Sequence, residues 1–178
     1  MRLAESRREV EQIAGLFPPD QVSVLMDEQA TEENVKTAGR LGGFRFVHFA
    51  THGLLNEERP SYSGLILSLP GGPKAAPSGD PQSERTGAQS PNRTPQSERL
   101  SRQSEDGLLQ VYEVFNLKLN ADLAVLSACE TGLGKDVRGE GLVGLTHSFL
   151  YAGTPSVMVS LWNVQDRSTA DLMVKFYQ

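Results

Sequence analysis

A short apolar run that ends at a lone cysteine is the feature that most constrains this chain. The run, Leu123 to Leu126, opens the segment LAVLSACETG, and Cys129 is the single cysteine among 178 residues. A continuous apolar run of this length is typical of a strand covered on both faces, as in parallel sheets. The pattern predicts an open α/β sheet with Cys129 at its carboxyl edge, where such sheets bind ligands.

A second run has the same construction. FRFVHFATHG is apolar up to Ala50 and continues with Thr51, His52 and Gly53. If the two runs form neighbouring parallel strands, His52 and Cys129 leave the sheet at the same edge. A thiol with a pKa of about 8.5 is only a few per cent ionised at neutral pH, so a cysteine nucleophile needs a nearby imidazole. The sequence therefore predicts Cys129 as nucleophile and His52 as its base.

Two other histidines compete with His52 for the role of base. His48 lies inside the predicted strand, where a histidine is usually packed and hydrogen-bonded, and His147 lies inside a predicted helix. His52 alone stands just beyond a predicted strand end.

The loop TGLGKD raises a different possibility, because a strand, a Gly-rich loop and Lys135 are typical of a phosphate-binding loop. The spacing argues against it. That motif needs glycine where this chain has Cys129, and Ser or Thr where it has Asp136. Gly132 and Gly134 are better explained as positions where the backbone passes close to a peptide or to the predicted dyad.

Four motifs in a fixed order give the chain a family resemblance. HFATHG, LSACETG, GEGLVGL and SLWNVQD follow one another, and the match extends from SRREVEQIA to the last predicted helix, outside residues 71–105. Together they resemble the CHAT domain, a caspase-like, clan CD cysteine peptidase family often associated with TPR repeats. Four ordered motifs are far more specific than any one of them.

The resemblance implies a fold, a dyad and a reaction. The fold is a caspase-like three-layer α/β/α sandwich with a mostly parallel central sheet, formed by residues 1–178 as a single domain. The dyad is His52 and Cys129, with backbone N–H groups of Gly53 and Cys129 as oxyanion donors. The reaction is peptide-bond hydrolysis through thiolate attack and an acyl-enzyme. The implied partners are a peptide or protein substrate and an attached or associated TPR array.

CHAT domains usually carry more sequence on both sides of the part that this chain matches, including a core strand before the first helix and a helix and strand after Gln178. The resemblance therefore implies a chain truncated at both ends, marginally folded or self-associated when alone. It also leaves open a second function, a non-catalytic caspase-like scaffold or protein-binding module.

Acidic and aromatic residues near the predicted strand ends are candidates for a substrate pocket. Glu130, Trp162 and Asp166 are the main ones, with Asp136 and Glu140 nearby in sequence. The acidic residues among them suit a basic or polar substrate side chain next to the scissile bond. The alternative is that they are solvated loop charges, helix caps or, for Trp162, a packing residue.

Periodicity and capping signals predict the remaining elements. Helices are expected at 4–17, at 32–38 with Thr31 as N-cap and Gly39 as stop, at 142–152, and up to Tyr177 with Asp166 or Ser168 as N-cap. Strands are expected at 21–26, 44–51, 64–69, 107–114 and 156–161 in addition to the cysteine strand. The strands at 64–69 and 107–114 are expected to pair as a hairpin.

Residues 71–105 differ from the rest of the chain. They are rich in Pro, Gly, Ser, Gln and Arg, and PQSER occurs twice. Such a segment buries too little apolar surface to offset its ordering entropy, so we expect a disordered insertion at the tip of that hairpin. It is either a neutral insertion or a regulatory or cleavable linker.

Composition excludes several functions. The net charge of −5 and pI near 5.2 argue against nucleic acid or an anionic membrane as the main partner. The sequence has no apolar run long enough to span a bilayer and no signal-peptide pattern at its start. A single cysteine allows no internal disulfide, which predicts a cytoplasmic location. No cluster of residues has metal-ligand spacing, so neither a metal nor an organic cofactor is expected.

Overall fold

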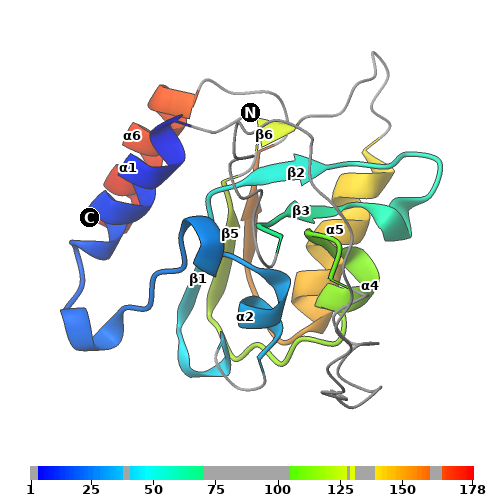
Figure 1. Cartoon of the computed structure of the whole chain (residues 1–178), viewed down its shortest axis with the longest axis horizontal. Helices are drawn as coiled ribbons and strands as arrows, with labels where there is room; N and C mark the ends of the chain where they lie inside the picture. Colours follow the sequence, from blue (N-terminus) through cyan, green and yellow to red (C-terminus); the bar gives the residue numbers. More distant parts are fainter. Residues whose placement is uncertain (1–3, 38–40, 70–104, 128, 131–138, 161–165) are drawn as a thin grey trace, which may run out of the picture.

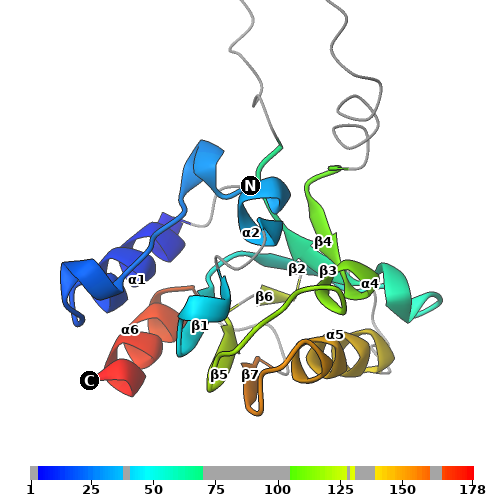
Figure 2. The same cartoon turned by 90° about the horizontal axis from the view of Figure 1, so that it is seen from below.

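The computed structural model describes residues 4–37, 41–69, 105–127, 129–130, 139–160 and 166–178. A parallel sheet lies between two layers of helices (Figures 1 and 2). The helices are α1 (Ala4–Ala14), α2 (Glu32–Lys36), α4 (Val111–Val114), α5 (Glu140–Tyr151) and α6 (Asp166–Tyr177), with short 3₁₀ turns η1 (Pro19–Gln21), η2 (Asp27–Gln29), η3 (Leu41–Gly43) and η4 (Pro60–Tyr62). The strands are β1 (Phe46–Phe49), β2 (His52–Leu54), β3 (Gly64–Ile66), β4 (Leu108–Gln110), β5 (Leu123–Leu126), β6 (Cys129–Glu130) and β7 (Val157–Val159).

The central sheet has the order β1-β5-β7, and both pairings are parallel. Its strands lie in three of the predicted strand segments, and the two before His52 and Cys129 are neighbours, as predicted. Alternate residues on a strand face opposite sides of the sheet, so each strand meets both helical layers. The predicted α/β fold with a parallel sheet is therefore confirmed.

One face of this sheet is covered by α1 and α6, which lie side by side (Figures 1 and 2). Val125 of β5 packs there with Ile13 of α1 and Met173 of α6. The amphipathic pattern of the first helix predicted this buried stripe. The helix α1 ends at Ala14 rather than at Phe17. Beyond it, the N–H groups of Leu16 and Phe17 bond to carbonyls three residues earlier, as in a 3₁₀ turn.

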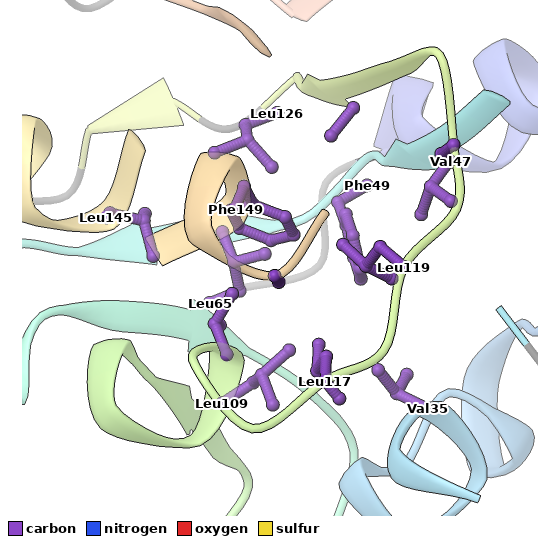
Figure 3. Packing of buried hydrophobic residues seen from close by; sticks show 14 of the residues in the cluster. Val35, Val47, Phe49, Leu65, Leu109, Leu117, Leu119, Leu126, Leu145 and Phe149 are labelled. Carbon is purple, nitrogen blue, oxygen red and sulfur yellow. The ribbon is translucent and has the colours of Figure 1, made fainter. Parts of the chain in front are cut away.

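The opposite face carries the larger core, which Figure 3 shows between the sheet and helices α2 and α5. Phe49 of β1 meets Phe149 of α5 with ring centroids 5.6 Å apart. Ala124 and Leu126 flank Val125 in sequence and face this side, as a period of two requires. Leu65, Leu109 and Phe149 are fully buried, and burial of this kind is the main force that holds the layers together.

A second sheet, of four short strands, lies across the carboxyl ends of β1 and β5 in Figure 1 and has the order β4-β3-β2-β6. β3 and β4 form the predicted antiparallel hairpin, with Leu65 opposite Leu109. The insertion at 71–105 therefore joins two paired strands. All of that insertion except Glu105 lies outside the described residues.

Lys36 of α2 fixes the base of this hairpin. Its ammonium contacts the carboxylates of Glu32 at 2.7 Å, Glu113 at 2.6 Å and Glu105 at 3.2 Å. Burial lowers the pKa of Lys36, but its hydrogen bonds to Glu113, Glu32 and Glu105 outweigh that effect and raise the pKa above its usual value. Glu32 is 1% exposed and also accepts a hydrogen bond from the Gly107 N–H. The cluster thus ties α2, α4 and the first residues after the insertion together.

One predicted strand is wrong and another is too long. Residues 22–26 have extended backbone at both ends but join no ladder among the described strands, because the turns η1 and η2 on either side set their path. In 107–114 the strand ends at Gln110 and α4 follows. Glu113 accepts a hydrogen bond from the Gln110 N–H in a capping box, which starts a helix where the sequence suggested a continuing strand.

Smaller differences concern element ends. The Thr31 side chain accepts from the Asn34 N–H, which confirms the predicted N-cap, but α2 ends at Lys36 and Gly39 lies outside the described residues. β7 is half-buried rather than fully buried and spans only three residues. The last helix begins at Asp166, so Asp166 is its first residue and Ser168 lies inside it, and neither is the N-cap that was predicted.

Candidate active site

His52 is the first residue of β2, so the prediction that the strand ends just before it is wrong in one respect. The apolar run of β1 ends at Phe49, the chain breaks from strand geometry at residues 50–51, and it resumes at His52. Thr51 fixes this break, since its hydroxyl donates a hydrogen bond to the Ile66 carbonyl of β3. The break turns the chain from the central sheet into the second sheet.

Cys129 occupies the equivalent position on the neighbouring chain segment. β5 ends at Leu126, and β6 begins at Cys129. β2 and β6 pair in parallel, with His52 opposite Cys129 and Gly53 opposite Glu130. Neighbouring strands lie about 4.8 Å apart, so the backbones of His52 and Cys129 are in direct ladder contact.

The two breaks keep a common register. Phe46 pairs with Leu123 in the central sheet, and His52 pairs with Cys129 in the second sheet. In both ladders the partners are 77 residues apart, the separation that also joins Arg45 to Asp122. Arg45 Nε contacts the Asp122 carboxylate at 2.6 Å where the two strands begin. The strands therefore turn together, and the register set at their start carries through to the His52 and Cys129 pair.

The loop after β2 is held against the first turn of α5. The Asn56 N–H donates to the Ser63 hydroxyl at 2.9 Å, and Ser63 is fully buried. A Cβ on Gly141 would lie 2.6 Å from that hydroxyl oxygen, so glycine is required there for the helix to approach the loop. The sequence analysis did not predict a role for Ser63 or Gly141. The glycines in the motif GEGLVGL were the one sequence signal of this close contact.

A small hollow lies next to these elements. It is lined mostly by aliphatic side chains, from Leu55, Leu65, Leu126, Leu142, Leu145 and Val159, together with Gly53 and Ser160. Gly53 directly follows His52, so the hollow adjoins the strand that carries the candidate base. None of its lining residues is charged.

The other candidate residues are placed unevenly. Glu130 pairs with Gly53 in the ladder, Glu140 is exposed at the start of α5, and Asp166 is the first residue of α6. Trp162 and Asp136 lie outside the described residues, as do Gly132 and Gly134. Among the residues that the structure describes, no group of three or more His, Cys, Asp or Glu side chains is placed to hold a metal ion.

His48 is bound into the structure, as its position in the strand predicted. Its Nε2 lies 2.8 Å from a carboxylate oxygen of Glu9, and its Nδ1 lies 3.3 Å from the hydroxyl of Tyr177. The ring also packs edge-on against Tyr177. Burial and the nearby Glu9 charge raise the pKa of Tyr177 to about 12. His48 thus links β1 to α1 and α6. His147, by contrast, is exposed on α5.

The parallel sheet between two helical layers, with His52 paired with Cys129 in a second ladder beyond its carboxyl ends, is consistent with a caspase-like fold. A family model described as the CHAT domain matches residues 1–178, and the chain belongs to that family.

Two relatives are tetratricopeptide repeat proteins. Tetratricopeptide repeat protein 28 of mouse is 31% identical over 161 residues, and its human counterpart is 30% identical over 165 residues. Each alignment covers 86% of this chain but 6% of the relative. The chain therefore spans a small part of the relatives it matches. No helix within the described residues is long and apolar enough to cross a membrane.

Proposed function

We propose that this chain is a cysteine endopeptidase that hydrolyses peptide bonds with Cys129 as nucleophile and His52 as base. The observation that carries the proposal is the β2–β6 ladder, in which the two residues are direct partners. Membership of a caspase-like family supports it as well. A thiol and an imidazole brought together from distant parts of the sequence are the minimum that this chemistry requires.

The proposed reaction has two halves. His52 accepts the thiol proton, the sulfur attacks the carbonyl carbon of the scissile peptide bond, and the imidazolium returns the proton to the departing amine. The resulting thioester is then attacked by a water that His52 deprotonates, which releases the acid product and restores the thiol. The N–H groups of Gly53 and Cys129 are the proposed donors to the oxyanion, each donor being worth about 3 to 4 kcal/mol in comparable enzymes.

The test combines turnover with labelling of the thiol. A fluorogenic peptide library and a peptidyl chloromethyl ketone are applied to the wild type and to Cys129→Ala and His52→Ala. Each substitution is expected to abolish turnover, and the double variant is expected to lose no more than either single one, because the pair acts as a unit. His147→Ala is the matched control, since it removes an exposed histidine from α5.

Turnover by Cys129→Ala at the wild-type rate would end the peptidase proposal. A folded wild type that neither cleaves the library nor reacts with the ketone would instead support the scaffold function, in which the domain binds proteins without chemistry. Circular dichroism of every variant separates loss of chemistry from loss of fold.

The setting of this activity is also part of the proposal. Since both relatives are named for tetratricopeptide repeats, we propose an attached or associated TPR array as partner, delivering a peptide or protein substrate. A single cysteine that stays a free thiol is compatible with the reducing cytoplasm, which is the location that we propose. We further propose that residues 1–178 form one CHAT domain interrupted by the insertion at 71–105.

A further inference from the structure

Glu57 lies in the loop that leaves β2, shortly after His52, and its carboxylate is buried without a counterpart. Both carboxylate oxygens are shielded from solvent, and neither has a hydrogen-bond partner in the described part of the chain. The adjacent Glu58 and Arg59 are exposed. A buried carboxylate is stable only when a cation or hydrogen-bond donors accompany it. Glu57 therefore fits a site that a cationic ligand completes.

The backbone around Glu57 is fixed on both sides. The Asn56 N–H is bound by the Ser63 hydroxyl at 2.9 Å, and the Arg59 N–H donates to the Asn56 side-chain oxygen at 2.8 Å. Gly141 of α5 packs directly on this loop. The backbone on both sides of Glu57 is thus held in place by the fold of the loop.

The surroundings of the loop suit a long basic side chain. Leu55, on the same loop, lines the aliphatic hollow together with Gly53, the residue after His52. Lysine and arginine place their methylene stems on apolar surface and their charged heads against carboxylates. An acidic ligand would be repelled by Glu57, and a calcium ion requires many more oxygen ligands than one buried carboxylate supplies.

We propose that Glu57 recognises a basic side chain, lysine or arginine, of a peptide bound beside His52 and Cys129. The carboxylate pairs with the ammonium or guanidinium group, and the aliphatic hollow contacts the stem. This rests on the proposed function in so far as a peptide is the ligand. The sequence pointed to Glu130, Trp162 and Asp166 for specificity, and Glu57 is a separate carboxylate on a different loop.

The experiment compares two probes that differ in one charged group. Tripeptide chloromethyl ketones ending in lysine or in norleucine, which has an aliphatic chain without the amine, react with the full chain, and modification of Cys129 is followed by mass spectrometry. The wild type is expected to react at least tenfold faster with the lysine probe. Glu57→Gln is expected to lose that preference by slowing the lysine probe alone, whereas Glu58→Gln, the same change at an exposed neighbour, is expected to keep it.

Equal rates for the two probes in the wild type, or a lysine preference that survives Glu57→Gln, would overturn the assignment. If neither probe modifies Cys129, the proposed peptidase fails, and recognition is then decided by fluorescence anisotropy with labelled tripeptides that carry no reactive group. Tighter binding of the lysine peptide by wild type than by Glu57→Gln supports the inference; equal or absent binding refutes it. Should Glu57→Gln not fold, the comparison of lysine, norleucine and glutamate peptides on the wild type alone decides.

Discussion

Replacing Gly141 by alanine tests how tightly α5 is held against the loop that follows β2. The added Cβ would lie 2.6 Å from the Ser63 hydroxyl oxygen and 3.5 Å from the Asn56 backbone. The hydroxyl cannot simply rotate away, because Ser63 is fully buried and binds the Asn56 N–H at 2.9 Å. Either the hydrogen bond breaks or the helix moves outward.

The magnitude follows from two opposing effects. Overpacking at a buried contact destabilises by about 1 to 3 kcal/mol, and exchanging glycine for alanine inside a helix returns up to about 1 kcal/mol. The net expectation for Gly141→Ala is a loss of about 1 to 2 kcal/mol, or roughly 2 to 8 °C in melting temperature for a chain of this size.

Urea denaturation and thermal melting followed by circular dichroism measure this loss. Gly144→Ala is the control on the same helix. Its Cβ would meet Pro60 at 3.8 Å, an ordinary contact, so that variant is expected to gain about 0.5 to 1 kcal/mol from helix propensity. Adding Ser63→Ala to Gly141→Ala removes the clashing oxygen and is expected to recover part of the loss. A Gly141→Ala protein as stable as Gly144→Ala would refute the close-packing account.

Three further predictions concern residues away from the candidate dyad. His48→Ala leaves the buried Glu9 carboxylate without its partner, so a loss of about 2 to 3 kcal/mol in the free energy of urea unfolding is expected, with thiol labelling of the folded fraction unchanged. A neutral effect on stability would contradict the role of His48 as a link between layers. Lys36→Met leaves Glu32 buried among uncompensated carboxylates and is expected to lose about 3 to 5 kcal/mol, measured the same way, and a stable variant would show that the cluster is dispensable. Because the pKa of Tyr177 is raised from 10 to about 12, its neutral form stabilises the fold below pH 10, and that contribution is lost as pH rises towards 12. Tyr177→Phe should therefore weaken the alkaline fall in the urea midpoint, and identical pH profiles of the midpoint for the wild type and the variant would rule out this contribution.

Sequence patterns predicted those parts of the fold that depend on local regularity. The apolar runs of β1 and β5, the Thr31 cap and the antiparallel pairing of β3 with β4 all follow from short stretches of sequence. The juxtaposition of His52 and Cys129 was predicted for the same reason, since two similar runs imply two similar strands.

The features that were missed depend on contacts between distant residues. Nothing local in the apolar run ending at Ala50 signals that the chain breaks and resumes at His52, because the Thr51 bond to Ile66 belongs to another strand. Residues 22–26 have strand composition but lack a partner strand among the described ones. The inward carboxylate of Glu57 likewise becomes visible only when its loop is folded against α5.

The insertion lies in the sequence between His52 and Cys129, so a cut within it divides the protein into two fragments that each carry one residue of the candidate dyad. A single backbone cut within residues 70–104 leaves His52, β1, β2 and β3 on one polypeptide and Cys129 with β4, β5 and β6 on the other. All three ladders that join these halves, β1 with β5, β2 with β6 and β3 with β4, then become contacts between two chains. The pairing of His52 with Cys129 then depends on the affinity of the two fragments for each other. The reactivity of the Cys129 thiol after such a cut should therefore fall when the protein is diluted and return when it is concentrated.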